Sequence, residues 1–365
     1  MIRKSILLMA ATALTGVFAT VAIAQDKTVN VLNWSDYIDD SILADFTKET
    51  GIKVTYDVFD SNEILETRLL AGGSGYDVVV PSAHFLARQI QAGVFMKLDK
   101  SKLPNISNMW DVIAERTAQY DPGNEYSVNY MWGTTGIGYN TKKIKEALGI
   151  DAIDSWDVVF KPENISKLKD CGVHILDQSS DIVPTTLHWL GLDPNSTKAE
   201  DLAKAEEALL AIRPFVRKFH SSEYINALAN GDICLAVGWS GDIFQARDRA
   251  AEADQGVEIA YSVPKEGADM WFDQMAIPAD AKNVDNALAF INYIMKPEVA
   301  AKASNYVYYA NGNKASQEFI EKEILDDPAI YPDEATLAKL YSVLPLDPKN
   351  QRVMTRLWTK VTTGQ

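Results

Sequence analysis

Short apolar runs alternate with amphipathic stretches through the first third of the chain. Residues 29–32, 52–59 and 76–80 have the apolar, β-branched character of strands. Residues 42–49 have the spacing of an amphipathic helix, and Gly51 follows in the usual position for a helix end. Because parallel strands must be joined by a crossover, this alternation predicts a parallel sheet covered by helices.

The second half of the chain shows the same alternation. We predict strands at 173–177 and 233–237 and helices at 198–218 and 283–295. A chain of 365 residues is long enough for two cores, so we expect an α/β fold with two lobes. The Gly-rich stretch 132–140 is a candidate crossing between the lobes.

Polar and aromatic clusters follow three of the predicted strands, at 34–37, 81–82 and 238–242. Ligands of open α/β sheets bind beyond the carboxyl ends of the strands. These clusters are therefore candidates for one ligand site.

The N-terminus has the pattern of an export signal. Arg3 and Lys4 precede a charge-free run at 6–23, and Ala22-Ile23-Ala24 gives a small-x-small cleavage pattern. We expect residues 1–24 to be a cleaved signal peptide that directs the protein to the periplasm; the alternative is a membrane anchor. No later stretch reaches the roughly 20 apolar residues of a membrane span.

The charge balance limits the partners. The chain has 35 Lys plus Arg and 50 Asp plus Glu, a net charge of −15. Nucleic-acid binding draws most of its affinity from Lys and Arg, so we expect no nucleic-acid partner. The charge favours a cationic ligand, or it serves solubility alone.

The chain has two cysteines, Cys171 and Cys234. In an oxidising compartment a disulfide is the simplest interpretation, and closing a loop of about 64 residues would contribute up to ~4 kcal/mol. Two buried free thiols are the alternative.

The sequence does not contain the complete form of several nucleotide-binding, catalytic or metal-binding motifs. Gly133 and Gly138 have Walker spacing, but Tyr139 and Asn140 stand where Lys and Ser/Thr are needed. Ser240 is not flanked as in a nucleophile elbow, and the four histidines have no metal-ligand spacing. We therefore expect no cofactor, no metal and no catalytic residue.

What remains is aromatic rings next to carboxylates. The cluster 34–37 combines two rings with an acid, Trp239 precedes Asp242 by three, and Trp271 and Asp273 share one face of a strand. Rings attract cations and carboxylates accept their protons. Core tryptophans and turn aspartates are the structural alternative, and a glycoside hydrolase, which also combines two acids with rings, is the enzymatic one.

Several motifs together resemble the periplasmic polyamine-binding proteins of putrescine and spermidine ABC importers. They lie, in order, at 33–37, 57–63, 133–140, 229–234 and 238–242. The resemblance implies a type II periplasmic binding protein fold, with crossings near 131–133 and 255–257, and a disulfide between Cys171 and Cys234. The expected lobes are 25–132 plus 256–300, and 133–255 plus 301–365.

The resemblance also implies the ligand site. Trp34 and Tyr37 would be walls of an aromatic box, and Asp181 would grip one amine. His84 would lie beside the pocket. The full set of expected ligand-binding residues is Trp34, Ser35, Asp36, Tyr37, Ser82, Asp181, Trp239, Asp242, Trp271, Asp273 and Tyr309.

We therefore expect a receptor and not an enzyme: a monomer that delivers a polyamine to an inner-membrane permease. Trp271 favours spermidine, because putrescine-preferring members of the family carry Phe there; putrescine stays open. Affinity should weaken below about pH 4, near ordinary Asp pKa values. A receptor for another solute, such as a sugar or oligopeptide, and a secreted glycosidase are the alternatives.

Overall fold

A computed structural model describes residues 27–364. The signal peptide expected at 1–24 lies outside the described residues. The strands of the described chain form one sheet with the central order β2-β1-β3-β9-β4-β7-β5-β6, while β8 and β10 pair with β4. Their bounds are β1 Thr28–Trp34, β2 Lys53–Phe59, β3 Val78–Val79, β4 Ser127–Asn140, β5 Val173–Ile175, β6 Lys218–Phe219, β7 Leu235–Trp239, β8 Ile259–Ser262, β9 Asp269–Ala276 and β10 Ala310–Asn311.

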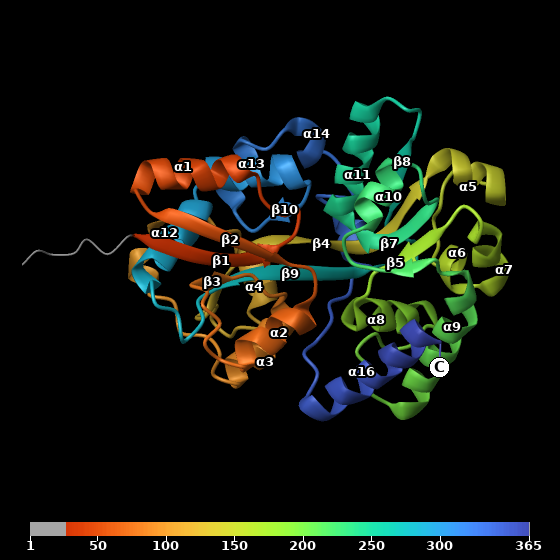
Figure 1. The fold of residues 1–365 in the computed structure, drawn as a ribbon, viewed down its shortest axis with the longest axis horizontal. Coiled ribbons are helices and arrows are strands. Elements are labelled where there is room, and N and C mark those ends of the chain that lie inside the picture. The colour runs from red at the N-terminus through yellow and green to blue at the C-terminus, as the bar shows by residue number, and fades with distance from the viewer. Residues whose placement is uncertain (1–26, 365) are drawn as a thin grey trace, which may run out of the picture.

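The helices cover both faces of this sheet (Figure 1). In the first part of the chain they are α1 Asp40–Thr50, α2 Asn62–Leu70, α3 Ala83–Gln91 and α4 Asp111–Thr117. In the middle they are α5 Thr141–Leu148, α6 Asp157–Phe160, α7 Pro162–Ile165, α8 Ser179–Trp189, α9 Ala199–Ile212, α10 Tyr224–Ala229 and α11 Ser240–Ala253. The last are α12 Val284–Ile294, α13 Pro297–Val307, α14 Lys322–Leu325, α15 Glu334–Leu337 and α16 Pro348–Thr363.

Local chemistry sets several of these boundaries. The Asp39 side chain accepts a hydrogen bond from Ser41 N at the start of α1, and Gly51 ends this helix in the left-handed conformation with φ 71°. The helix expected at 198–218 stops at Ile212, because a short 3₁₀ turn with Pro214 follows it.

The sheet is parallel at both ends and antiparallel in the middle. β1 pairs in parallel with β2 and β3, and β5 pairs in parallel with β6 and β7. The predicted parallel pairing is confirmed there. β4 and β9, which were not among the strands predicted from the alternation, pair antiparallel with each other. These two strands carry the chain from one end of the sheet to the other and back, so they must run in opposite directions.

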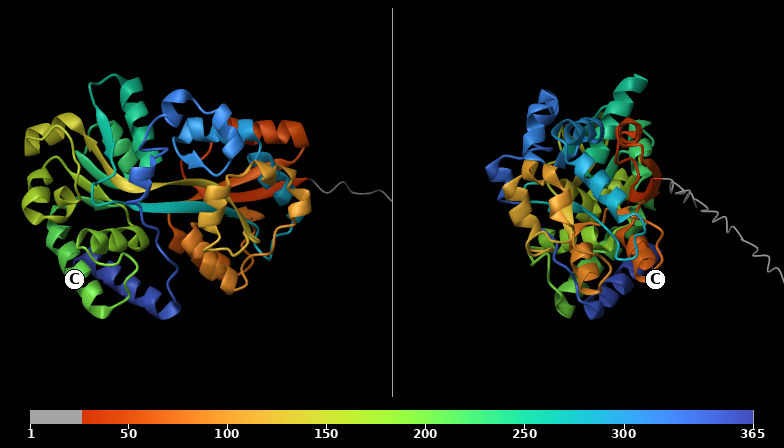
Figure 2. Two further views of the ribbon diagram at one scale, coloured as in Figure 1. Left: turned by 180° about the vertical axis from the view of Figure 1, so that it is seen from behind. Right: turned by 90° about the vertical axis from the view of Figure 1, so that its left-hand side faces the viewer.

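β4 is the long central strand, and all of its residues are buried. Its first half pairs with β9, and its second half pairs with β7 and β8. Figures 1 and 2 show β4 and β9 running through the middle of the molecule between two groups of helices. The stretch 132–140 is thus a crossing, as expected, but it is an extended strand and not a loop.

The glycines of this strand permit close packing. A Cβ on Gly133 would lie 2.7 Å from Cζ2 of Trp271, and one on Gly138 would overlap the side chain of Ile243. A larger residue at either position would displace a neighbour, so these glycines serve packing and not a phosphate loop.

The two largest of three hydrophobic clusters of the described residues lie on either side of the crossing. The first is built by buried residues between 29 and 131 and between 271 and 309. The second is built by residues between 137 and 259 and by α16, residues 354–361.

These cores divide the chain differently from the expected lobes. The expected boundary at 300 falls inside α13, yet Val299, Ala303 and Val307 of this helix all belong to the first core. The return crossing lies along β9 and not at 255–257, because β8 still pairs with the second half of β4. We propose 27–132 plus 269–311 as the first lobe and 133–262 plus 348–364 as the second.

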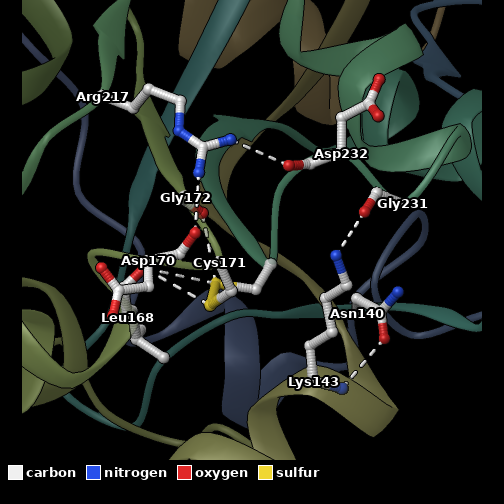
Figure 3. Close-up of a disulfide and its surroundings, with 10 residues drawn as sticks. Asn140, Lys143, Leu168, Asp170, Cys171, Gly172, Arg217, Gly231 and Asp232 are labelled. Carbon is white, nitrogen blue, oxygen red and sulfur yellow. Dashed lines mark hydrogen bonds between the residues drawn. A yellow bond between two sulfur atoms is a disulfide. The ribbon is translucent and has the colours of Figure 1, made fainter.

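The expected disulfide joins Cys171 to Cys234, with their Cα atoms 5.5 Å apart, so the prediction is confirmed. It links the segment before β5 to the start of β7. Arg217 braces the same region by donating to the backbone oxygens of Asp170 and Asp232, each at 2.9 Å (Figure 3). Among the described residues, no helix is both long and apolar enough to cross a bilayer.

Candidate ligand-binding site

A cleft between the two lobes encloses about 510 Å³, part of it open to solvent. Ten of the eleven expected ligand-binding residues line it, and Asp36 does not. The lining residues are Trp34, Ser35, Tyr37, Asn62, Ser82, His84, Asp181, Ser221, Trp239, Asp242, Asp269, Trp271, Asp273 and Tyr309.

Strand ends and helix starts place these side chains. Trp34 ends β1 and Trp239 ends β7. Ser82 directly precedes α3, while Asp181 and Asp242 lie in the first turns of α8 and α11. The site is therefore at the carboxyl edge of the parallel strands, where the strand-end clusters indicated it.

Aromatic rings from both lobes form the walls. Trp34 of the first lobe meets Trp239 of the second edge-on, with their centroids 5.5 Å apart. Tyr309 stands edge-on to Tyr37 and to Trp271, each at 5.2 Å. Such pairs hold the rings in defined orientations.

A glycine makes room for one of these walls. A Cβ on Gly241 would lie 2.5 Å from the ring of Tyr309. The glycine of the 238–242 motif thus permits Tyr309 to pack on the first turn of α11, directly beside Asp242.

Asp242 is held by two phenols. Its carboxylate accepts hydrogen bonds from Tyr224 at 2.6 Å and from Tyr309 at 2.7 Å. Burial raises the pKa of Asp242 to about 7, although the two hydroxyl donors act in the opposite direction.

Asp273 has an equivalent environment built from other elements. It accepts hydrogen bonds from Tyr37 at 2.8 Å and from Ser82 at 2.7 Å. The Asn62 amide orients Ser82 by donating to its hydroxyl at 3.0 Å. Burial again raises the pKa, to about 7 for Asp273.

Asp181 and Asp269 form the remaining acidic part of the cleft. Asp181 accepts hydrogen bonds from the Thr135 hydroxyl at 3.0 Å and from Trp239 Nε1 at 3.1 Å. Burial raises the pKa of Asp181 and raises that of Asp269 well above its ordinary value, and the charge of Asp181 adds to the second effect.

None of these four carboxylates forms a salt bridge with a Lys or Arg of the described chain. The four are Asp181, Asp242, Asp269 and Asp273, and each is at least 94 % buried. His84 adds no positive charge, because burial, followed by the nearby Arg88, lowers its pKa to about 3. The cleft is thus acidic, and no Lys or Arg of the described chain neutralises its carboxylates by a salt bridge.

Further polar atoms in the cleft wall lack partners. His84 Nε2, Ser221 Oγ and Trp271 Nε1 are buried and have no hydrogen-bond partner among residues 27–364. Buried polar groups are normally satisfied, so these atoms are available to a ligand or to water.

Asp36, unlike the other expected ligand-binding residues, does not line the cleft. Its side chain is 40 % exposed, and it pairs with Arg249 of α11 at 2.8 Å. Gln245 Nε2 donates to the backbone oxygen of Asp36 at 3.2 Å. Asp36 therefore joins the two lobes at the rim of the cleft, and a direct ligand contact stays a prediction.

The sequence reasoning missed three lining residues as site residues: Asn62, Ser221 and Asp269. Asp269 precedes Trp271 by two and Asp273 by four in one strand, so the alternation that linked those two residues could have identified it. Ser221 follows β6, but the sequence predicted a helix up to 218 and no strand there, so the rule of ligands beyond strand ends gave no signal for it.

Comparison with known proteins gives the family. Residues 41–332 match the model of the bacterial extracellular solute-binding proteins. The chain is 55 % identical over 354 residues to the putrescine-binding periplasmic protein SpuD of Pseudomonas aeruginosa, covering 96 % of both chains. It is 53 % identical over 355 residues to the putrescine-binding periplasmic protein PotF of Escherichia coli, covering 97 % of this chain and 96 % of that one.

A solved structure agrees with the fold. The spermidine/putrescine ABC transporter substrate-binding protein PotD of Streptococcus pneumoniae superposes with a TM-score of 0.75 at 30 % identity, covering 92 % of this chain and 99 % of the other. The expected periplasmic binding protein fold is confirmed. This chain belongs to the bacterial extracellular solute-binding protein family.

Proposed function

We propose that this protein is the periplasmic receptor of an ABC importer and that it binds a polyamine between its lobes. It is a binding protein and not an enzyme, which agrees with relatives that are named as binding proteins. The observation that carries the ligand class is the set of four buried acids without a cationic partner in the described chain.

The physical argument rests on charge. A buried carboxylate without a counter-charge is strongly unfavourable. The protonated amines of a polyamine supply that charge, and each ammonium–carboxylate hydrogen bond contributes about 1.5–3 kcal/mol. The methylene groups between the amines pack against the rings, and the ring faces attract the ammonium groups.

Ligand binding would hold the lobes together. Asp273 is bound to Tyr37 and Ser82 of the first lobe, whereas Asp242 lies on α11 of the second. A ligand that bridges the two acids stabilises only the closed arrangement, so it shifts the protein toward that state. The closed receptor then delivers its ligand to the membrane permease.

The relatives favour putrescine among the polyamines. Two relatives above 50 % identity are named as putrescine-binding, while the 30 % identical structure is named for both spermidine and putrescine. Putrescine therefore replaces spermidine as our first candidate. The influence of Trp271 on this choice stays a prediction.

Calorimetric titration of protein that has been unfolded and refolded to remove bound ligand tests the proposal. We expect heats of binding with putrescine and spermidine and none with maltose. Binding of maltose but of neither amine would identify a sugar receptor instead. Release of product from a chromogenic glycoside would support the glycosidase alternative, and we expect none.

A further inference from the structure

Asp269 lies at one end of an acidic row on β9. Asp269, Trp271 and Asp273 occupy alternate positions of this strand, and all three line the cleft. At a rise of about 3.3 Å per residue, the Cα atoms of Asp269 and Asp273 are roughly 13 Å apart. Asp269 is therefore separate from the diamine region of Asp242 and Asp273.

Asp269 shares its part of the cleft with Asp181. In the sheet, Asp269 is paired with Thr135 of β4, and the Thr135 hydroxyl donates to Asp181 at 3.0 Å. The charge of Asp181 raises the pKa of Asp269, and it raises the pKa of Asp273 as well. No Lys or Arg of the described chain forms a salt bridge with either one.

The backbone contacts of Asp269 leave one of its carboxylate oxygens without a donor. Other buried aspartates of this chain bind backbone amides. Asp77 accepts from the amides of Asn30, Lys282 and Asn283, and Asp121 accepts from three successive amides after Asn124. Asp269 receives one such backbone hydrogen bond, from Val343, but its Oδ1 atom is buried and has no donor among residues 27–364.

We propose that Asp269 and Asp181 form a second cation subsite, which binds the ammonium group at the far end of a polyamine with three nitrogens. The proposal rests on the function proposed above, in which Asp242 and Asp273 bind the other part of the ligand. Asp269 is then a specificity-determining residue that separates triamines from diamines.

The chemistry of the pair suits an ammonium group. Two neighbouring buried carboxylates repel each other unless a proton or a cation lies between them. A primary ammonium has three N–H donors and can bind one oxygen of each acid at the same time. The unpartnered hydroxyl of Ser221 in the same cleft is a further acceptor.

The test measures the binding of two ligands to the wild-type protein and to two variants. Spermidine and N-propylputrescine differ in one respect, since the latter lacks the terminal ammonium of the aminopropyl arm. We expect Asp269→Asn to weaken spermidine binding at least about tenfold and N-propylputrescine binding less than about threefold. Asp285→Asn, which removes an exposed surface carboxylate, is the matched control and should change neither.

The wild-type protein gives a second readout that does not depend on the variant's folding. It should bind spermidine at least about tenfold more tightly than N-propylputrescine. Equal affinities would overturn the subsite, as would an equal loss of both ligands, or no loss of either, in Asp269→Asn. Failure of the wild type to bind any of these amines, putrescine included, would instead overturn the proposed function.

Discussion

Asp242 and Asp36 lie near each other at the junction of the lobes, and the charge of Asp36 contributes to the raised pKa of Asp242. Asp242 is buried and its carboxylate accepts hydrogen bonds from two hydroxyl groups, whereas Asp36 is partly exposed and paired with Arg249. Glu66 of α2 likewise has a cationic partner, since it forms an ion pair with Arg88 of α3 at 2.5 Å.

This difference shows how the chain uses its cations. Arg249 and Arg88 each reach across the junction of the lobes, the first to Asp36 and the second to Gln351 of α16 at 2.6 Å. The rim cations thus help to close the protein, while the interior acids are left for a cation from outside. The two regions should respond differently to mutation, pH and salt.

Loss of an interior charge should have the largest effect. Asp242→Asn keeps the shape of the side chain but removes the charge that meets an ammonium group. We expect putrescine and spermidine affinity to fall by at least ~1.5 kcal/mol, about tenfold or more, in calorimetric titration.

The rim provides the matched control for this variant. Asp36→Asn removes the same charge from a partly exposed ion pair, so we expect less than a fivefold change. Unchanged affinity in Asp242→Asn would remove Asp242 from the site. A loss in Asp36→Asn as large as that in Asp242→Asn would place Asp36 in the binding interior.

Acidification should affect the interior acids next most strongly. Burial raises the pKa of both Asp242 and Asp273 to about 7, so lowering the pH below 7 protonates them. A protonated acid must lose its proton before it can pair with an ammonium group. Affinity should therefore fall as the pH drops, by up to about tenfold per pH unit for each proton displaced.

This prediction replaces the decline below pH 4 that ordinary Asp pKa values gave. The measurement is the dissociation constant of putrescine at pH 8, 7, 6 and 5, with circular dichroism to show that the chain stays folded. A constant affinity down to pH 5 would show that the acids of the free receptor titrate as exposed groups.

The contrast between interior and rim could be predicted only in part from the sequence. Trp271 and Asp273 were placed together correctly because strand alternation is a local rule. Asp36 was grouped with its neighbours Trp34 and Tyr37 because they adjoin in sequence. Its pairing with Arg249, 213 positions away, depends on how the lobes meet.

The fold was predictable to a similar extent. Local apolar patterns located five of the ten strands of the described residues and several helices, including β1 and α12. The antiparallel pairing of β4 with β9 and the assignment of α13 to the first core depend on contacts between segments more than 130 residues apart, for which local pattern has no signal.

Removal of an ion pair at the rim of the cleft should have a smaller, salt-dependent effect on ligand affinity. Arg249→Gln removes the cross-lobe ion pair with Asp36. Exposed ion pairs of this kind contribute about 0.2–1 kcal/mol. We expect up to a fivefold loss of putrescine affinity at low ionic strength, fading toward 1 M salt as screening weakens the pair in the wild type.

An ion pair within one lobe is the control for this variant. Lys302→Gln removes a comparable pair with Asp45, which joins α13 to α1. It should leave affinity unchanged at every salt concentration. An equal effect of the two variants would indicate that general surface charge, and not closure of the lobes, governs the affinity.

The smallest expected effect concerns the choice between two polyamines. Trp271 is nine-tenths buried, packs edge-on against Tyr309 at 5.2 Å, and fills the space that Gly133 leaves open. Trp271→Phe should lower spermidine affinity relative to putrescine affinity by about threefold, because the smaller ring offers a weaker cation–π surface to the longer ligand. Calorimetric titration of both amines, with Trp110→Phe outside the cleft as the control, measures the ratio. If both affinities stay constant, Trp271 is a structural wall, and the discrimination between polyamines must come from the acids alone.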